Sequence, residues 1–289
     1  MKVIVGPASI LLAEQVAQTL GVESVPVAFK VFPDGENYVR LEGNVQNEEV
    51  AIIQTTSPPQ DARLIQLAFI ADAAKRNGAE KITAVVPYLA YARQDKVFLE
   101  GEPISADTVA RMLNAAGVER LITVNFREEM LSQFPFPAMN LSAIPLLAEY
   151  FLKRGHSEAF AVSPDKGAIR IAEEAQKTLG GECGYLEKTR DRYSGLVSME
   201  AKTFDVKDKT VIIFDDIISS GGTIVAAAKI LRELGPRHIY VACVHPLLIG
   251  QAEQLILRAG VEEIVGTDSV PSSVSKVSLA PIISRELAR

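Results

Sequence analysis

Short runs rich in Val and Ile alternate with amphipathic stretches along the whole of this 289-residue chain. The runs include residues 2–5, 50–54, 82–87 and 210–214, and each is apolar at most positions. A strand with few polar positions is buried on both faces, as the strands of parallel sheets are. Amphipathic stretches between such strands form the helices of right-handed crossovers. We therefore expect an α/β fold made of two doubly wound parallel-sheet domains.

Residues 134–143 are the best candidate for a domain boundary, because Pro135, Pro137 and Ser142 interrupt the pattern there. We expect an N-terminal domain of residues 1–142 and a C-terminal domain of residues 143–289. The last helix is free to pack back on the N-terminal domain. Near the start of the chain, Ser9 is a suitable N-cap for a helix that a glycine ends.

Composition argues against several other classes of protein. Acidic residues outnumber basic ones by 36 to 30, and a net charge of −6 does not favour broad nucleic-acid binding. Cys183 and Cys243 are far apart and form no CxxC pair, so neither a disulfide scaffold nor a cysteine zinc site is expected. No apolar run is long enough to cross a bilayer, and Gly6 and Pro7 interrupt the apolar N-terminus. We expect a soluble, cytoplasmic protein without a membrane partner.

The segment of residues 211–223 carries the most chemistry. An apolar strand ends in Asp215 and Asp216, a short loop follows, and then a helix begins. The loop supplies Ser219, Ser220, Gly221, Gly222 and Thr223. Glycine N–H groups, hydroxyls and a helix N-terminus suit a phosphate monoester, and paired carboxylates suit a sugar diol or a magnesium ion. The alternative is a capped helix start with solvated acids, for which Ser and Gly are also common.

This segment resembles the phosphoribosyl-diphosphate-binding motif of the type I phosphoribosyltransferase superfamily. The shared pattern is an apolar strand, Asp-Asp, two apolar residues, small residues and Gly-x-Thr. The resemblance implies that both domains have the plan of that superfamily. Its members either transfer the phosphoribosyl group to a base or synthesise phosphoribosyl diphosphate (PRPP).

Three further segments resemble those of the ribose-phosphate diphosphokinases, also called PRPP synthetases. They are residues 32–36, residues 88–96 with 101–105, and residues 163–168, and the resemblance extends from the first strand to residue 278. It implies transfer of the diphosphoryl group of Mg-ATP to the anomeric hydroxyl of ribose 5-phosphate, which yields PRPP and AMP. A single-domain phosphoribosyltransferase would leave the first half of the chain without a role.

The resemblance implies that two elements of the N-terminal half bind ATP. The residues concerned are Phe32, Asp34, Gly35, Glu36, Arg93, Gln94, Asp95 and Arg127. The ring of Phe32 can stack on a base, and the guanidinium of Arg93 can bind phosphate oxygens. From composition alone, a tight turn at residues 32–36 and a solvated loop at Arg93 are the alternatives. In the family the first element reaches the ATP site of a neighbouring subunit, which implies a dimer-based homo-oligomer, with a hexamer left open.

In the C-terminal half, the resemblance implies that Asp215, Asp216 and residues 219–223 bind ribose 5-phosphate. It also implies catalytic roles for Lys188 and Arg190, which follow an expected strand and would close over the reaction from a mobile loop. Composition alone supports only a basic loop there. Asp165 is the expected ligand of Mg²⁺, either directly or through water.

Arg127 departs from the family pattern. PRPP synthetases usually carry a His at the metal–ATP site, in a pattern like Asp/Asn-x-His, whereas this chain reads Asn125, Phe126 and Arg127. A guanidinium stays charged and does not bind magnesium, although it can contact an ATP phosphate, and Glu128 or Glu129 can recruit the ion. Two alternatives stay open. One is a non-catalytic regulatory paralogue that assembles with an active synthetase, and the less favoured one is a phosphoribosyltransferase.

Overall fold

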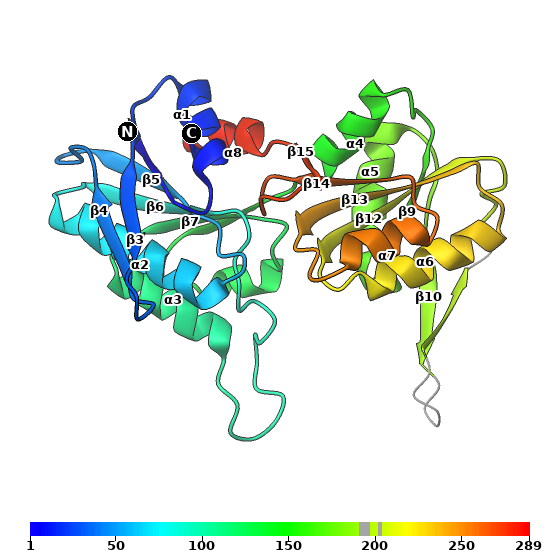
Figure 1. Cartoon of the computed structure of the whole chain (residues 1–289), viewed down its shortest axis with the longest axis horizontal. Coiled ribbons are helices and arrows are strands. Elements are labelled where there is room, and N and C mark those ends of the chain that lie inside the picture. Colours follow the sequence, from blue (N-terminus) through cyan, green and yellow to red (C-terminus); the bar gives the residue numbers. More distant parts are fainter. Residues whose placement is uncertain (191–196, 202–203) are drawn as a thin grey trace. The chain divides into compact units, whose positions relative to one another are not determined.

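The computed structural model describes residues 1–190, 197–201 and 204–289 (Figure 1). The chain divides into two compact units. Unit 1 comprises residues 1–142, 269–271 and 278–289, and unit 2 comprises residues 143–268 and 272–277. Each unit is built on its own sheet of mainly parallel strands, so the predicted α/β fold with two parallel sheets is confirmed.

Unit 1 is built on a parallel sheet of six strands. In spatial order these are β2 (Ser24–Val25), β1 (Lys2–Val5), β5 (Glu49–Ile53), β6 (Lys81–Val86), β7 (Arg120–Val124) and β8 (Ala138–Leu141). Helices α2 (Gln60–Arg76) and α3 (Ser105–Ala115) share one hydrophobic cluster with the sheet. Helices α1 (Ile10–Leu20) and α8 (Ala280–Leu287) pack against each other and cover the other face (Figure 1).

The central strands of unit 1 are buried on both faces. In β5 and β6 only the first residues, Glu49 and Lys81, are exposed. Each apolar side chain that is removed from water in this way contributes about 1.5 to 3 kcal/mol. The continuous apolar runs of the sequence are therefore accounted for by helices on both faces of a parallel sheet.

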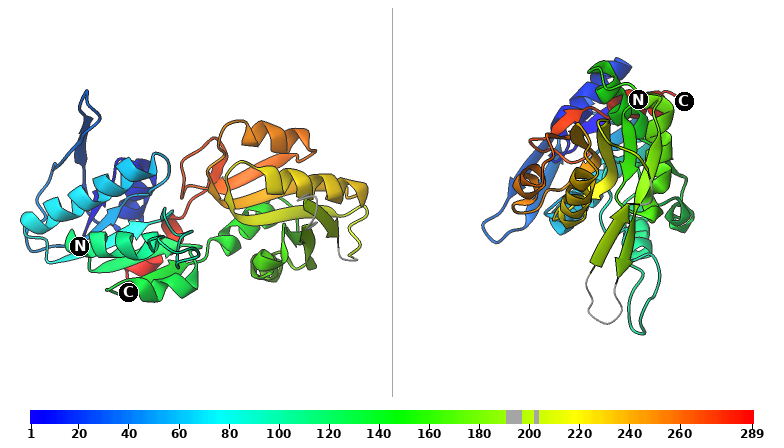
Figure 2. Two further views of the ribbon diagram at one scale, coloured as in Figure 1. Left: turned by 90° about the horizontal axis from the view of Figure 1, so that it is seen from below. Right: turned by 90° about the vertical axis from the view of Figure 1, so that its right-hand side faces the viewer.

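A two-stranded hairpin projects from unit 1 (Figure 2). Its strands β3 (Val27–Val31) and β4 (Asn37–Leu41) are antiparallel, and Val31 pairs with Asn37 beside the loop. Strand β4 packs against α2. Isolated hairpins are only marginally stable in water, so this packing is needed to hold the hairpin in place.

The C-terminal helix α8 belongs to unit 1. Glu286 of α8 is only 5% exposed and forms ion pairs with Arg120 of β7 at 2.5 Å and with Arg289 at 3.1 Å. Ser278, just before the helix, donates a hydrogen bond to Gln15 of α1 at 2.6 Å. These contacts hold the end of the chain against β7 and α1.

Unit 2 is built on a sheet of seven strands. In spatial order these are β11 (Val197–Ala201), β10 (Cys183–Arg190), β9 (Phe160–Ser163), β12 (Thr210–Ile218), β13 (His238–Pro246), β14 (Glu263–Thr267) and β15 (Ser275–Val277). Neighbouring strands are parallel except β10 and β11, which are antiparallel. Helices α4 (Ile144–Lys153) and α5 (Ile169–Leu179) pack together on one face, and α6 (Gly222–Glu233) and α7 (Ala252–Arg258) lie on the other (Figure 1).

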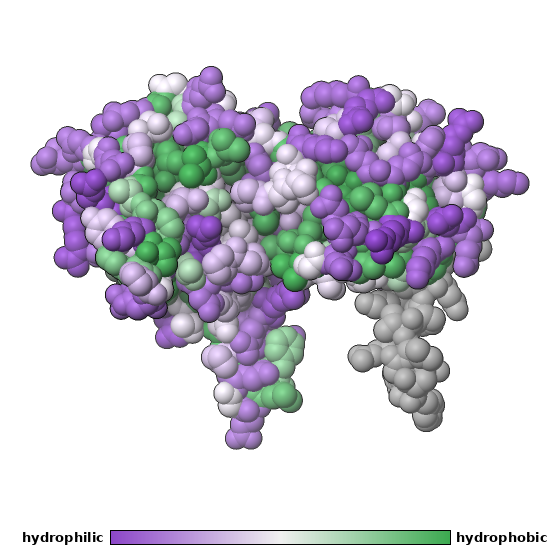
Figure 3. Space-filling model, in the orientation of Figure 1, coloured by the Kyte–Doolittle hydropathy of each residue, from purple (hydrophilic) through white to green (hydrophobic). Residues whose placement is uncertain are grey.

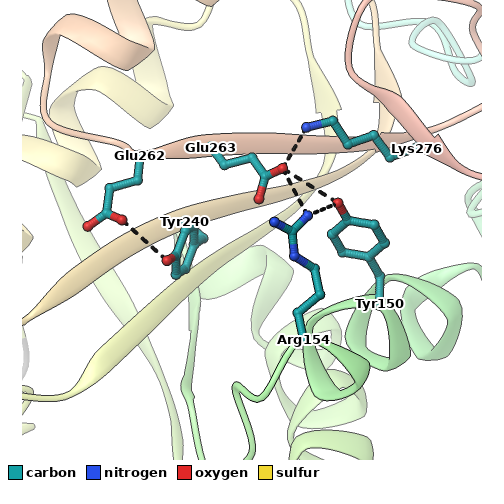
Figure 4. Close-up of polar contacts among 6 residues, drawn as sticks. All are labelled: Tyr150, Arg154, Tyr240, Glu262, Glu263 and Lys276. Carbon is teal, nitrogen blue, oxygen red and sulfur yellow. Dashed lines mark hydrogen bonds and ion pairs between the residues drawn. The ribbon is translucent and has the colours of Figure 1, made fainter.

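Glu263, the first residue of β14, lies at the centre of a polar cluster in unit 2 (Figure 4). Its Oε1 accepts hydrogen bonds from Lys276 of β15 at 2.5 Å and from Arg154 at 3.3 Å. The hydroxyl of Tyr150 in α4 donates to the same oxygen at 3.5 Å. The cluster therefore joins α4 to β14 and β15 at the amino-terminal end of β14, away from the carboxyl ends of the strands.

Three local predictions are corrected by the structure. Ser9 precedes α1, but its hydroxyl does not cap the helix and instead accepts a hydrogen bond from the N–H of Thr55 at 2.8 Å. Residues 138–141, for which we predicted no strand and which lie in the candidate boundary of residues 134–143, pair with β7 and form β8. Strand β12 is longer than the apolar run and includes Asp215 and Asp216, which were expected to follow it.

Two remaining features bear on the class of protein. Cys183 and Cys243 are free thiols. Within the described ranges, no helix combines the length and the apolar composition that crossing a membrane requires.

Candidate active site

The chain reverses its direction of winding in unit 2 between β9 and β12. From β9 it proceeds to β10 on one side, and later to β12 on the other side, so β9 and β12 are neighbours. In open α/β sheets, ligands bind beyond the carboxyl ends of the strands at such a switch point. Asp165 follows β9, and Asp215 and Asp216 lie in the last part of β12. The fold therefore brings three carboxylates to one candidate site.

These three carboxylates interact electrostatically. Burial raises the pKa of Asp215 well above its usual range, and the charge of Asp216 raises it further. A hydrogen bond between the two side chains and the charge of Asp165 act in the same direction. The N–H of Asp216 opposes the shift, since it donates to Oδ1 of Asp215 at 3.0 Å. A ligand that brings hydrogen-bond donors or positive charge is therefore favoured at this site.

Helix α6 begins at the carboxyl end of β12 without a side-chain cap. Its N-cap residue, Gly221, has a φ of 78°, a conformation that favours glycine. At Gly222, apart from its chain neighbours and the backbone of its own helix, no atom lies within 4 Å of the position that a Cβ would occupy. Open space thus adjoins the first turn, whose N–H groups have no side-chain partner among the described residues, and helix starts of this kind bind phosphate groups. The side-chain cap that composition also allowed is absent from this part of the described chain.

The carboxylates at the switch point fit a magnesium ion that is held jointly with a substrate. Among the described residues, no group of three or more His, Cys, Asp or Glu side chains is arranged to hold a metal ion. Asp165 uses its Oδ1 to accept a hydrogen bond from the N–H of Ala168 at 3.1 Å. Magnesium is commonly bound through one or two carboxylates together with substrate phosphates. Asp165 can contribute one such carboxylate oxygen.

Lys188 and Arg190 lie within β10 and do not follow it, because the strand continues to Arg190 and pairs with β11. The prediction that these two residues follow the strand is therefore wrong. Their side chains, and the expected loop at residues 191–195, lie outside the part of the chain that the structure describes. Their catalytic roles therefore stay predictions.

Residues 32–36 form the exposed loop of the hairpin in unit 1. The N–H of Phe32 donates to the carbonyl of Glu36 at 2.8 Å, and the N–H of Gly35 donates to the carbonyl of Phe32 at 2.9 Å. The carboxylate of Asp34 accepts from the N–H of Glu36 at 3.1 Å. The loop is therefore the tight turn that its composition indicates. This turn leaves the ring of Phe32 and the carboxylate of Glu36 at the surface, so it is compatible with nucleotide binding.

The second N-terminal element follows β6. The hydroxyl of Ser105, the first residue of α3, donates to Oε1 of Gln94 at 2.5 Å, and Arg93 is exposed. Asp95 forms an ion pair with Arg127, which lies just beyond β7, with 3.4 Å between Oδ2 and Nη1. The other oxygen of Asp95, Oδ1, is buried and has no hydrogen-bond partner among the described residues. The structure thus brings together Asp95 and Arg127, but the contacts of the described residues do not join them to the hairpin loop.

Two amides that support this element were not predicted. Asn140 of β8 accepts from the N–H of Phe126 at 2.8 Å and donates to its carbonyl at 2.9 Å. Gln133 donates to the carbonyl of Asp95 at 3.1 Å. Both side chains bind backbone groups, and a backbone partner leaves no signal in the residue pattern. They fix the chain next to Arg127 and the backbone of Asp95.

The loop between β6 and α3 also presents apolar side chains to solvent (Figure 3). Val97, Phe98 and Leu99 are 52%, 58% and 71% exposed. The Nζ of Lys96 lies 5.1 Å from the centroid of the Phe98 ring. Glu102 accepts hydrogen bonds from the N–H groups of Phe98 and Leu99, at 2.8 and 2.9 Å. The tip of the loop is therefore ordered by its own contacts.

Both halves of the chain match known protein families. Residues 1–117 match the N-terminal domain of ribose phosphate pyrophosphokinase, and residues 136–271 match the phosphoribosyl transferase domain. The ribose-phosphate pyrophosphokinase of Methanothermobacter thermautotrophicus is 43% identical over 96% of this chain and 96% of its own length. That of Methanosarcina mazei is 40% identical over 100% of this chain and 95% of its own length. The chain belongs to the ribose-phosphate pyrophosphokinase family.

The fold leads to the same family. The crystal structure of phosphoribosylpyrophosphate synthetase from Mycobacterium smegmatis matches with a TM-score of 0.87 at 32% identity, and the match covers 100% of this chain and 97% of that chain. A ribose-phosphate pyrophosphokinase transfers the diphosphoryl group of ATP to the anomeric hydroxyl of ribose 5-phosphate, which yields PRPP and AMP, and this is the activity of the chain. Arg127 lies between the two matched ranges, so neither family model tests the predicted departure at this position.

Proposed function

We propose that this pyrophosphokinase binds ribose 5-phosphate through unit 2. The observation that carries the proposal is the meeting of Asp165, Asp215 and Asp216 at the switch point, beside the uncapped start of α6. The N–H groups of α6 and the hydroxyls of residues 219–223 bind the 5-phosphate. Asp215 and Asp216 accept hydrogen bonds from the ribose hydroxyls. These bonds add donors to the one that Asp215 already has, the N–H of Asp216.

We assign ATP binding to unit 1. The residues are Phe32, Asp34, Gly35, Glu36, Arg93, Gln94, Asp95 and Arg127. The ring of Phe32 stacks on adenine, an interaction worth about 1 to 3 kcal/mol per base. Its orientation is restricted before binding, because the Nζ of Lys30 lies 4.8 Å from the ring centroid and the Tyr38 ring lies 6.3 Å away, edge to face. Arg93 and Arg127 contact the phosphates.

The anomeric hydroxyl attacks the β-phosphorus of ATP in line and releases its proton to water. The bond between that phosphorus and the oxygen bridging to the α-phosphate breaks, and AMP leaves with the bonding electron pair. Such transfers depend on positioning and on neutralisation of charge. Asp215 and Asp216 hold the sugar in position, and Lys188 and Arg190 neutralise the transferring group.

Mg²⁺ is the proposed cofactor, and Asp165 is the residue proposed to hold it together with substrate oxygens. When bound, the ion neutralises charge on the phosphate oxygens. Arg127 supplies a fixed positive charge to the same phosphates, since a guanidinium binds phosphate without a metal.

We further propose a dimer-based homo-oligomer, with a hexamer left open. Within the described part of the chain, no hydrogen bond or ion pair joins residues 32–36 to Arg93, Gln94 or Arg127. A second copy can therefore supply one of the two ATP-binding elements. Unit 1 also exposes several large apolar side chains for a partner to cover, namely Phe29, Val31, Ile65, Phe69 and Tyr91. Free thiols are typical of reducing compartments, and we place the enzyme in the cytoplasm.

The double variant Asp215→Asn/Asp216→Asn tests the assignment of unit 2. It keeps the shape of both side chains and removes their charge. PRPP formation should fall about 100-fold or more, the scale expected when stabilising groups at a reacting centre are lost, whereas ATP binding by unit 1 should stay within about twofold. Asp205→Asn is the control, because Asp205 is an exposed residue of unit 2. Unchanged PRPP formation would contradict the assignment. A wild-type protein that binds both substrates but forms no PRPP would support the regulatory-paralogue alternative.

A further inference from the structure

Unit 1 has its own switch point, between β1 and β5. The chain proceeds from β1 to β2 on one side and later reaches β5 on the other side. The chain's own side chains fill the position where such sheets usually bind ligands. Gln54, Thr55 and Thr56, directly after β5, are fully buried. A Cβ on Gly6, directly after β1, would lie 2.4 Å from Oε1 of Gln54, so the two strand ends are in close contact.

Gln54 begins a chain of hydrogen bonds that leads away from this closed position. Its Oε1 accepts from the N–H of Ala8 at 2.9 Å, and its Nε2 donates to Oε1 of Gln66 in α2 at 3.2 Å. The Nε2 of Gln66 donates to Oδ1 of Asn37 at 3.0 Å, and its Oε1 also accepts from Arg63 at 3.1 Å. Gln54 is 0% and Gln66 2% exposed. Water therefore does not replace the bond between the two glutamines when it breaks, whereas Asn37 and Arg63 are half-buried.

The chain of amides ends at the hairpin. Asn37 is the first residue of β4, directly follows Glu36 and pairs with Val31 across the hairpin. A projecting pair of strands has little stability of its own, so its direction depends on the contacts at its base. The buried amides provide a directional contact there, because a hydrogen bond fixes geometry more narrowly than apolar packing does.

We propose that Gln66 is a positioning residue, which sets the direction of the hairpin β3–β4 from the closed switch point of unit 1. The proposal rests on the assigned role of residues 32–36 in ATP binding. The hydrogen-bond partners of Gln66 are Gln54, Arg63 and Asn37, so its effect on ATP runs through Asn37. In unit 2 the switch point is the proposed site of the sugar. In unit 1 the corresponding switch point anchors the hairpin.

Gln66→Met tests this role, because it keeps the length of the side chain and removes both hydrogen-bonding groups. The KM for ATP should rise about fivefold to tenfold, as expected for the loss of the hydrogen bond between Gln66 and Asn37. The kcat and the KM for ribose 5-phosphate should stay within about twofold. Gln176→Met is the matched control, since Gln176 is a half-buried glutamine of unit 2 that donates to the carbonyl of Gly181 at 3.0 Å. A fall in kcat at unchanged KM for ATP, or the same rise in the control, would overturn the proposal.

Asn37→Ala breaks the same chain at the hairpin and leaves the core intact, so it serves if Gln66→Met does not fold. Amide hydrogen exchange at residues 31–38 should quicken in either variant, and this readout does not depend on the reaction. Because both substitutions break one chain, the double variant should raise the KM for ATP no more than the stronger single variant does. The positioning role would be refuted if the two substitutions had additive effects on the KM for ATP. Unchanged amide hydrogen exchange at residues 31–38 would refute it as well. Faster exchange in a protein that forms no PRPP would leave that role standing and reject the proposed function.

Discussion

The Nη1 of Arg127 lies 3.4 Å from Oδ2 of Asp95. The side chain of Arg127 is 59% exposed and that of Asp95 is 21% exposed, so the guanidinium reaches from the surface to a half-buried carboxylate. The ion pair joins the segments that follow β7 and β6. It places a permanent positive charge at the position where the sequence resemblance predicts a His of the metal–ATP site. A phosphate can bind to that charge directly.

Arg127→Ala should weaken ATP binding about tenfold, which corresponds to one charge-assisted hydrogen bond. The binding that remains should also depend more strongly on magnesium than in the wild type, because the fixed charge is gone. Calorimetric titration with ATP, with and without magnesium, measures both effects. Arg111→Ala is the control, since Arg111 is an exposed residue of α3 paired with Asp107 at 3.0 Å. Equal magnesium dependence in the wild type and Arg127→Ala would contradict the role of Arg127.

Asp215→Asn should stabilise the protein near neutral pH while it impairs catalysis. Burial and the charge of Asp216 raise the pKa of Asp215 in the folded state above its value in the unfolded chain. Between those two pKa values the folded state binds more protons, so the free energy of unfolding falls as the pH rises. The Tm of the variant should rise by about 2 to 4 °C for each kcal/mol by which the charged Asp215 destabilises the folded wild type. The gain should vanish below about pH 4, near the pKa of an unperturbed Asp. Thermal unfolding across pH checks this, and a lower Tm of the variant at neutral pH would refute it.

Gly221→Ala and Gly222→Ala should separate folding from phosphate binding. A Cβ at Gly221 would lie 3.1 Å from Cδ1 of Ile256 on a backbone with a φ of 78°, so this variant should lose about 1 kcal/mol or more. A Cβ at Gly222 meets nothing within 4 Å, so this variant should be nearly as stable as the wild type. Its methyl group would occupy space beside the proposed phosphate, and the KM for ribose 5-phosphate should rise about tenfold, or 1.4 kcal/mol. Urea denaturation and steady-state kinetics measure the two effects. An unchanged KM in Gly222→Ala would exclude phosphate binding at the start of α6.

Glu286→Ala should destabilise unit 1 by about 3 kcal/mol, because it leaves the partly buried guanidinium of Arg120 without its partner. The carboxylate of Glu286 is 5% exposed and also pairs with Arg289. Lys153→Ala is a suitable control, since it removes an ion pair with Glu149 whose side chains are 77% and 46% exposed, and such pairs contribute about 0 to 1 kcal/mol. The midpoints of urea unfolding measure both losses. Equal losses in the two variants would show that the burial of Glu286 has no energetic effect.

The strands of the core could be predicted from the sequence because continuous apolar runs indicate strands that are buried on both faces. The apolar runs at residues 50–54 and 82–87 became β5 and β6, displaced by one residue to start at Glu49 and Lys81. Backbone pairing defines where a strand begins, and a polar residue at the edge of the sheet can pair as well as an apolar one. For the same reason β12 continues through Asp215 and Asp216, where hydrophobicity alone predicts that it ends.

The candidate site could be predicted where its chemistry is local in the sequence. Asp215, Asp216 and the loop of residues 219–223 are contiguous, so their residue types indicated a phosphate and sugar site before the fold was known. The contacts of Asp95 with Arg127 and of Gln66 with Asn37 join residues 32 and 29 positions apart. Such pairs require the fold, because no periodicity relates their positions.

Phosphorus NMR of the purified protein with ribose 5-phosphate, ATP and magnesium tests the central claim most directly. Transfer of the diphosphoryl group predicts that AMP and PRPP appear in equal amounts, and only when ribose 5-phosphate is present. ADP with inorganic phosphate, or AMP without PRPP, would contradict diphosphoryl transfer to the sugar.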